Sequence, residues 1–203
     1  MKNAGKTSKG KRFAIGLALY LSAVAVGLGS AWWVLRKFTG SDTVVKVGAW
    51  SGSTLTGSPE ADMYTRARVA LSGLLALGRS ETMYYMATTD DAGRPLRARC
   101  TYRVEGTPPP ARWWSITAYA DDYFLFDAPN KQFSLNGTTA QLDAAGKFAL
   151  GTGPAALPGV HWLPTPGERG LVLTLRLYNP LPDLQAAPSR LVPPTINPVG
   201  ACP

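Results

Sequence analysis

The chain has 203 residues, 45% of them hydrophobic and 17% charged, which is enough for one globular domain of ordinary size and some additional sequence. The net charge of +8 is concentrated at one end, because residues 1–37 contain seven of the 21 basic residues and no acidic residue. The rest of the chain, with 14 basic and 13 acidic residues, is nearly neutral. Nucleic-acid binding needs a basic face on the folded domain, so we expect no nucleic-acid partner.

Residues 13–35 are predicted to form a transmembrane helix after a basic leader, residues 1–12. The run FAIGLALYLSAVAVGLGSAWWVL has no charged residue. At about 1.5 Å per residue it reaches roughly 35 Å, enough to cross a hydrocarbon core of about 30 Å. Two tryptophans near its end suit the membrane interface, and the basic pair Arg36 and Lys37 ends the run. The excess of positive charge before the run orients the N-terminus to the cytoplasm and the domain to the other side.

The alternative is a cleaved signal peptide, because small residues of the kind found at cleavage sites occur in residues 23–25 and 29–31. The apolar run continues past both points and ends in a basic stop, which favours a retained anchor. Residues 36–59 follow as a linker rich in Gly, Ser and Thr, with one plausible strand at residues 44–50.

Residues 60–77, EADMYTRARVALSGLLAL, have the best helical pattern outside the apolar run. Arg66 and Arg68 lie off an apolar stripe, which consists of Ala67, Ala70, Leu71, Leu74 and Leu75. Ser58 and Pro59 precede this segment and Gly78 follows it, as expected at helix ends. We expect this amphipathic helix to pack across a sheet.

The core of the domain is predicted to form around residues 111–126, ARWWSITAYADDYFLF. One side of an extended strand there carries Trp114, Ile116 and Ala118, and the other side carries Trp113, Ser115, Thr117 and Tyr119. Further strands are expected at residues 82–88, 96–105, 123–126, 132–136, 141–143, 147–150, 161–163 and 171–178. Closely spaced strands after one helix predict a mainly β domain, an antiparallel β-sandwich or barrel, over residues 60–203. Residues 180–203 contain seven prolines and are predicted to form an extended surface strap.

The chain has two cysteines, Cys100 in a predicted strand and Cys202 at the penultimate position. In an oxidising compartment, one pair so far apart in sequence suggests a disulfide that holds the proline-rich tail. The alternative is a buried free thiol at Cys100 and an unbonded thiol at Cys202.

The sequence offers little catalytic chemistry. His161 is the only histidine, and no nucleophile elbow, phosphate-binding loop or Cys-x-x-Cys pair is present, so we expect no catalytic motif, metal or cofactor. An acidic site beside the helix, formed by Asp62, Arg66 and Glu81, is the best enzymatic hypothesis. Exposed aromatic faces suit sugar stacking, and the candidate ligand-binding residues are Trp113, Tyr119, Tyr123 and Trp162.

The soluble part resembles the bacterial domain-of-unknown-function family 1214. The segments that carry the resemblance are ADMYTRARVALSGLLAL with ETMYY, DDAGRPL leading to CTY, ARWWSITAYADDYFL, HWLPTP, and LTLRLYNP with the proline-rich end. The resemblance implies a jelly-roll-like sandwich in the bacterial envelope and supplies no catalytic residues. In many relatives the domain follows a family 1254 domain, whereas here it follows the apolar run.

Together these features predict a single-pass protein of the bacterial inner membrane, with residues 13–35 in the lipid bilayer and the C-terminal domain in the periplasm. Our leading hypothesis is a non-enzymatic module that binds an envelope glycan, lipid or protein partner. The alternative is an enzyme that acts on envelope polysaccharide or lipid through the acidic residues near the helix. The sequence does not indicate an oligomeric state.

Overall fold

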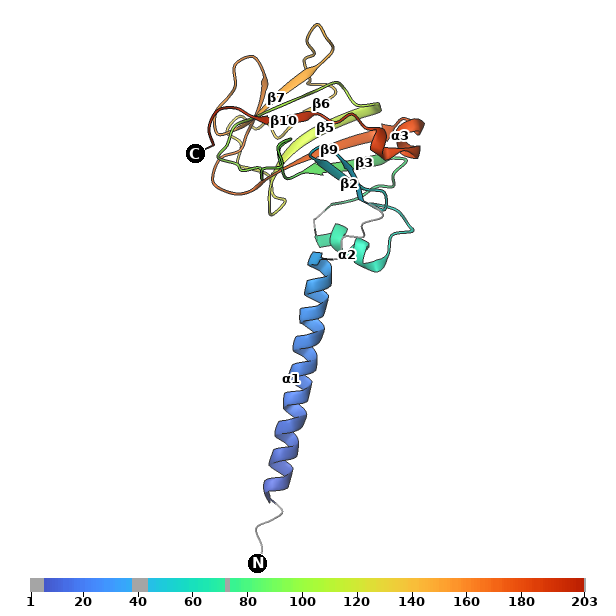
Figure 1. The fold of residues 1–203 in the computed structure, drawn as a ribbon, viewed down its shortest axis with the longest axis vertical. Coiled ribbons are helices and arrows are strands. Elements are labelled where there is room, and N and C mark those ends of the chain that lie inside the picture. Colours follow the sequence, from blue (N-terminus) through green and yellow to red (C-terminus); the bar gives the residue numbers. More distant parts are fainter. Residues whose placement is uncertain (1–5, 38–43, 72–73, 203) are drawn as a thin grey trace, which may run out of the picture. The chain divides into compact units, whose positions relative to one another are not determined.

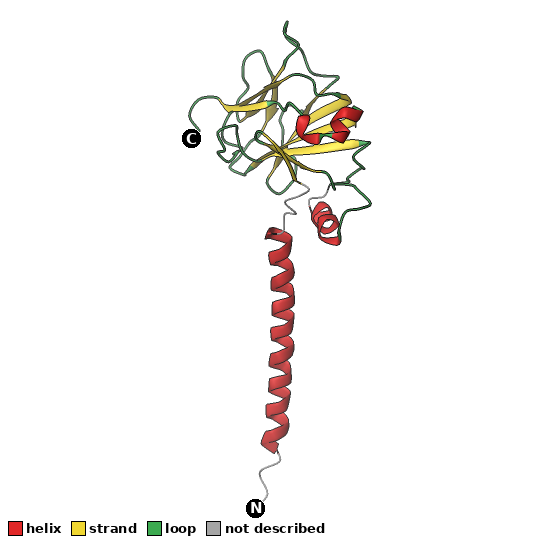
Figure 2. Cartoon of the chain, turned by 45° about the vertical axis from the view of Figure 1, so that its right-hand side comes forward, coloured by secondary structure: helices red, strands yellow, loops and turns green. Residues whose placement is uncertain are grey.

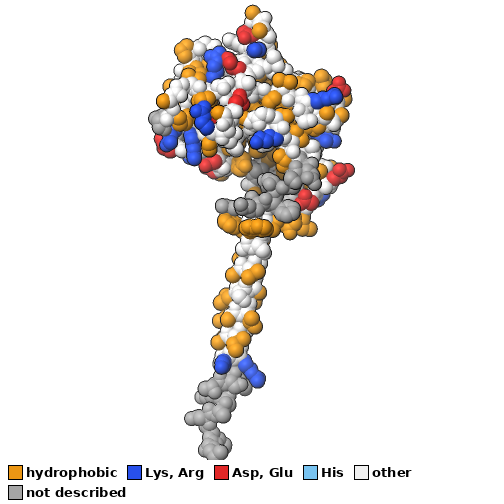
Figure 3. All heavy atoms as spheres, in the orientation of Figure 1, with side chains coloured by type: hydrophobic (Ala, Val, Ile, Leu, Met, Phe, Trp, Pro, Cys, Tyr) orange, Lys and Arg blue, Asp and Glu red, His pale blue; other side chains and the backbone are white. Residues whose placement is uncertain are grey.

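A computed structural model describes residues 6–37, 44–71 and 74–202, which divide into two compact units, Met1–Gly40 and Ser41–Pro203. The first unit is a single helix, α1 (Lys6–Lys37), whose stretch Gly10–Val34 is long and apolar enough to cross a membrane. Figure 3 shows hydrophobic side chains along α1 and basic ones toward its N-terminal end. The predicted span is therefore one continuous helix of suitable length and composition.

The second unit is mainly β, with two sheets that form separate layers (Figures 1 and 2). The six-stranded sheet has the order β1 (Val44–Val47), β2 (Trp50–Ser53), β3 (Thr82–Ala87), β9 (Leu171–Pro180), β5 (Ala111–Ala120) and β6 (Ser134–Asn136). The four-stranded sheet has the order β10 (Thr195–Pro198), β4 (Tyr102–Gly106), β7 (Phe148–Gly153) and β8 (His161–Pro164). Two short helices and a 3₁₀ turn complete the described part of the unit: α2 (Met63–Leu71), α3 (Pro182–Ala186) and η2 (Pro188–Arg190).

The two sheets share one hydrophobic core. Trp114 of β5 stacks on Phe148 of β7 in the opposite sheet, with ring centroids 4.6 Å apart. Trp114 is 4% exposed, whereas its neighbour Trp113 is 37% exposed, as the alternation of a half-buried strand requires. The predicted mainly β fold with two sheets is confirmed, and Trp114 of β5 contributes to its core, although β5 lies next to the edge strand β6 and not at the centre of its sheet. The strand pairs are antiparallel except for β7 and β8, which are parallel.

Several segments depart from the sequence-based expectation; the strand predicted at residues 96–105, for example, begins only at Tyr102. The folded unit begins before Glu60, because β1 and β2 lie in the segment assigned to the linker and extend the six-stranded sheet. Residues 123–126 form a turn and a single bridge rather than a strand, and Tyr123 has a left-handed φ of 65°. Residues 141–143 likewise contribute only an isolated bridge. Their apolar composition resembles that of strands, but neither segment has a long neighbour with which to form a ladder.

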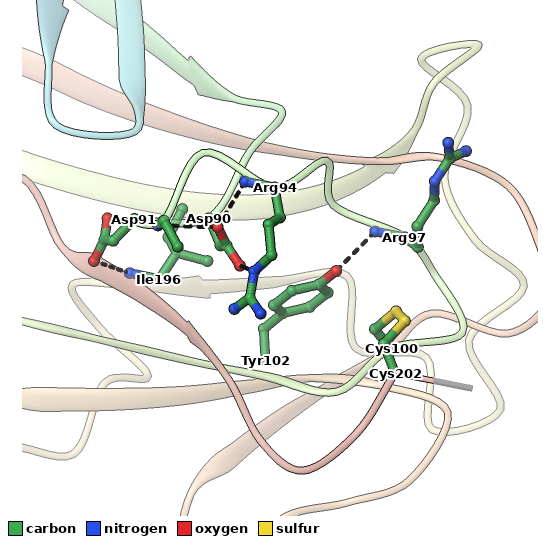
Figure 4. A network of polar contacts seen from close by, with 9 residues as sticks. Asp90, Asp91, Arg94, Arg97, Cys100, Tyr102, Ile196 and Cys202 are labelled. Carbon is green, nitrogen blue, oxygen red and sulfur yellow. Dashed lines mark hydrogen bonds and ion pairs between the residues drawn. A yellow bond between two sulfur atoms is a disulfide. The ribbon is translucent and has the colours of Figure 1, made fainter.

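The proline-rich tail is more structured than the predicted strap. It contains α3 and η2, and β10 then pairs along β4 at the edge of the four-stranded sheet. The backbone N–H of Ile196 donates to the carboxylate of Asp91 at 2.9 Å, and Cys100 is disulfide-bonded to Cys202 with 4.8 Å between Cα atoms (Figure 4). The predicted disulfide is therefore present, and it closes a tail that also has ladder hydrogen bonds.

The predicted amphipathic helix is shorter than its sequence pattern and does not pack across a sheet. α2 ends at Leu71, and residues 72–73 lie outside the described part of the chain. Met63 is 76% exposed and Leu71 is 72% exposed. A helical period predicts that an apolar stripe exists but not which surface covers it.

Candidate functional site

The two longest strands, β5 and β9, are neighbours in the six-stranded sheet, where β9 lies between β3 and β5, and β5 lies beside the edge strand β6. Alternate residues of both strands point into the core, including Trp114 and Leu177, which pair with each other. The residues between them therefore form the opposite face of the sheet. We call its centre the aromatic–arginine face, defined by Trp113, Thr117, Tyr119, Arg176 and Tyr178.

Arg176 is the charged residue of this face. Its guanidinium donates from Nη1 to the Thr117 hydroxyl at 3.3 Å and from Nη2 to the Tyr119 hydroxyl at 3.1 Å. Its Cζ lies 5.4 Å from the centroid of the Tyr119 ring, in a cation–π arrangement. Among the described residues, no ion pair includes Arg176. A partly buried cation thus has only neutral partners and keeps donor capacity for an anion.

Two further aromatic rings lie beside the arginine. Trp113 and Tyr178 are opposite each other in the ladder, with ring centroids 5.1 Å apart and planes tilted by 58°. The Trp113 indole N–H donates to the Thr138 hydroxyl at 3.1 Å, which fixes the orientation of the exposed ring. Aromatic rings offer stacking surfaces for the apolar faces of sugars, and a guanidinium recognises a carboxylate or phosphate.

The four aromatic residues predicted as ligand contacts are divided by the fold. Trp113 and Tyr119 lie on the aromatic–arginine face. Tyr123 is exposed in the turn after β5. Trp162 belongs to β8 in the four-stranded sheet, where its indole N–H donates to the carbonyl of Gly153 at 3.1 Å. These four residues therefore do not form a single site.

The predicted acidic site is not assembled. Asp62 caps α2: its carboxylate accepts from the backbone N–H groups of Tyr64 and Thr65 at 2.8 and 3.0 Å and from the Thr65 hydroxyl at 2.7 Å. The hydrogen bond from the Thr65 hydroxyl is the main reason that the pKa of Asp62 is lowered. Arg66 instead donates to the carbonyls of Ala61 and Pro59. Among the described residues, no ion pair joins Asp62, Arg66 and Glu81, so the arrangement provides no acid–base pair.

A polar cleft of about 930 Å³ lies against the four-stranded sheet. Its carboxylates are occupied, since Glu105 pairs with Arg103 at 2.6 Å and Asp143 accepts from backbone N–H groups of its own turn. His161 also lines the cleft; burial lowers the pKa of its imidazole, and its Nε2 is buried with no hydrogen-bond partner within the described structure. Both acids of the cleft therefore serve local structure, and they do not form the carboxylate pair that most glycoside hydrolases use.

Sequence reasoning missed Arg176 and Tyr178 as site residues. Their signal was present in the last predicted strand, where polar and aromatic residues alternate with four leucines. The pairing of β5 with β9 brings these residues beside Trp113 and Tyr119, although 57 residues separate Tyr119 from Arg176. A pairing between distant strands cannot be derived from the alternation within each strand.

The fold and this face define a two-sheet β protein with a polar and aromatic surface on its larger sheet. The chain belongs to the family described as "Protein of unknown function (DUF1214)", whose profile matches residues 81–182. The search of curated proteins finds no significant match.

Two solved structures are similar to the chain. The VPA0106 protein from Vibrio parahaemolyticus superposes with a TM-score of 0.58 at 19% identity, over 91% of this chain and 45% of that protein. A putative uncharacterized protein from Burkholderia cenocepacia gives a TM-score of 0.43 at 16% identity, over 58% of this chain and 29% of the other. The chain thus spans less than half the length of these proteins, and the first similarity supports the fold alone.

Proposed function

We propose that this protein is a membrane-anchored, non-enzymatic module of the bacterial envelope whose periplasmic β-sandwich binds an acidic glycan on the aromatic–arginine face. The observation that carries the proposal is Arg176, a partly buried cation whose hydrogen-bond partners among the described residues are hydroxyls, and which is flanked by exposed or half-buried aromatic rings. An acidic sugar satisfies both parts of this surface, because its carboxylate pairs with the guanidinium and its ring stacks on an aromatic side chain.

The membrane topology follows from the basic leader and the apolar helix. Positive charges before residues 13–35 favour a cytoplasmic N-terminus, which directs the domain to the periplasm. The Cys100–Cys202 disulfide supports this placement, since such bonds persist in oxidising compartments.

Binding is tested with the full chain in detergent micelles, titrated with polygalacturonate and, as an uncharged counterpart, its methyl ester. We expect binding of the acid form, and we expect Arg176→Gln to weaken it by about tenfold or more, the size of one charge-assisted hydrogen bond. Trp113→Ala should also weaken binding, because it removes the stacking surface. Arg99→Gln is the matched control, since Arg99 makes an exposed ion pair with Glu168 elsewhere on the domain.

Equal binding of the acid and its methyl ester would show that the arginine does not select the ligand. An unchanged affinity for Arg176→Gln, with a melting temperature like that of the wild type, would contradict the proposed site.

A further inference from the structure

The connection between β2 and β3 carries an apolar surface that the domain leaves exposed. These strands are neighbours in the sheet, yet residues 54–81 separate them and contain α2. Four of its large apolar side chains are especially exposed, with fractions of 76% for Met63, 46% for Tyr64, 72% for Leu71 and 93% for Leu75. We call these four residues the α2 apolar surface.

Two charged groups at the start of α2, Asp62 and Arg66, are bonded to neighbouring segments of the chain. The Asp62 carboxylate caps the first turn, and the Arg66 guanidinium donates back to carbonyls that precede the helix. Met63, Tyr64 and Leu71 fall on one side of the helix by their spacing. An amphipathic helix of a soluble domain usually buries this side, so its exposure indicates an apolar partner.

Both ends of the connection are held at the sheet. The carbonyl of Leu77 lies so close to Gly57 that an added Cβ would be 2.0 Å from it, and Gly57 has a left-handed φ of 72°. The backbone N–H of Leu77 also donates to the Tyr84 hydroxyl of β3 at 3.1 Å. The α2 apolar surface is therefore carried by a closed loop and not by a free chain end.

The length of the chain favours a lipid partner. α1 ends at Lys37 and β1 begins at Val44, so six residues intervene and the seven Cα–Cα steps between the two ends reach at most about 25 Å. Val44 pairs with Ser53, and Met63 follows ten residues later. With a span in residues 13–35, the length of the chain therefore limits how far Val44, the start of the folded unit, can lie from the bilayer surface.

We infer that the α2 apolar surface docks on the outer leaflet of the membrane that anchors the chain, as an interfacial helix does. This inference rests on the membrane anchor of the proposed function. Docking would give the domain a second membrane contact and restrict its orientation, so that the glycan site is presented in a defined direction.

The test uses the oxidised full chain in vesicles of phosphatidylcholine and phosphatidylglycerol, with an environment-sensitive fluorophore on one introduced cysteine. The native cysteines are bonded and do not react. Leu75→Cys reports on the proposed contact, Leu28→Cys on the anchor, and Ala144→Cys, exposed in a distant turn, is the control. At position 75 we expect blue-shifted emission and strong quenching by lipid that carries a shallow spin label. At position 28 we expect blue-shifted emission and strong quenching by lipid that carries a deep spin label. At position 144 we expect neither effect.

A label at position 75 that is not quenched, while the label at position 28 is, would overturn the docking and leave the anchor intact. A blue shift at position 75 without lipid quenching would indicate that a second copy of the chain covers this surface, and it would also overturn the docking. Loss of quenching at position 28 would contradict the anchor itself. Met63→Gln with Leu71→Gln should reduce quenching at position 75 without lowering the melting temperature, since both side chains are exposed.

Discussion

Trp113 and Trp114 are adjacent in the chain but have opposite surroundings. Trp114 is buried and stacks on Phe148 across the core, whereas Trp113 lies on the aromatic–arginine face. We expect Trp114→Ala to lower the free energy of unfolding by about 3–5 kcal/mol, because it leaves a large cavity between the sheets. Trp113→Ala should cost clearly less. Denaturant unfolding measures both variants, and equal small losses would show that β5 is not central to the core.

His161 connects protonation to stability. Burial lowers the pKa of its imidazole below 6.5, while a hydrogen bond with the backbone of Ser134 acts in the opposite direction with a smaller effect. The unfolded chain therefore binds a proton more readily than the folded chain, and stability should fall as the pH decreases through about 6.5 toward the lower folded pKa. In His161→Gln this decrease should be smaller between pH 7 and pH 5. Parallel stability profiles of the two proteins would refute the assignment.

Two separate interactions attach the C-terminal tail to the rest of the domain. β10 pairs with β4, and the disulfide joins Cys100 to Cys202 across 102 residues of sequence. In the chain-entropy description such a loop stabilises by at most about 4.7 kcal/mol, because it restricts the unfolded chain. Cys202→Ser should therefore lower the melting temperature and make the last ~20 residues more sensitive to protease than in the wild type.

Reduction of the wild type provides the matched control for Cys202→Ser and should lower the melting temperature by a similar amount. Thiol labelling of the unfolded, unreduced protein should find no free thiol. Two free thiols per chain would contradict the disulfide and weaken the case for a periplasmic domain.

The assembly of anchor and domain is tested by membrane topology. A reporter that matures only in the periplasm, fused after Pro203, should be active and should remain in the membrane fraction, because residues 13–35 are retained as a span. Activity in the soluble periplasmic fraction would indicate that the apolar run is cleaved. An inactive reporter would contradict the orientation derived from the charge distribution.

The properties that the sequence determined by itself are local or compositional. The apolar run, the strand alternation around Trp114 and the class of the fold follow from periodicity and charge, which each segment carries within itself. The disulfide between Cys100 and Cys202 could be predicted because the chain contains no other cysteine. These predictions do not depend on knowing which strands are neighbours.

The tertiary structure alone decided which distant residues meet. The register of β5 with β9 places Arg176 beside Thr117 and Tyr119. Part of the predicted strap forms the strand β10, because it pairs with the free edge of β4. It also decided that the apolar side of α2 stays exposed, although its period alone predicted a packed helix. The physical reason is that alternation and helical period define the faces of each element, whereas pairing and coverage depend on the competition among all elements for the same core.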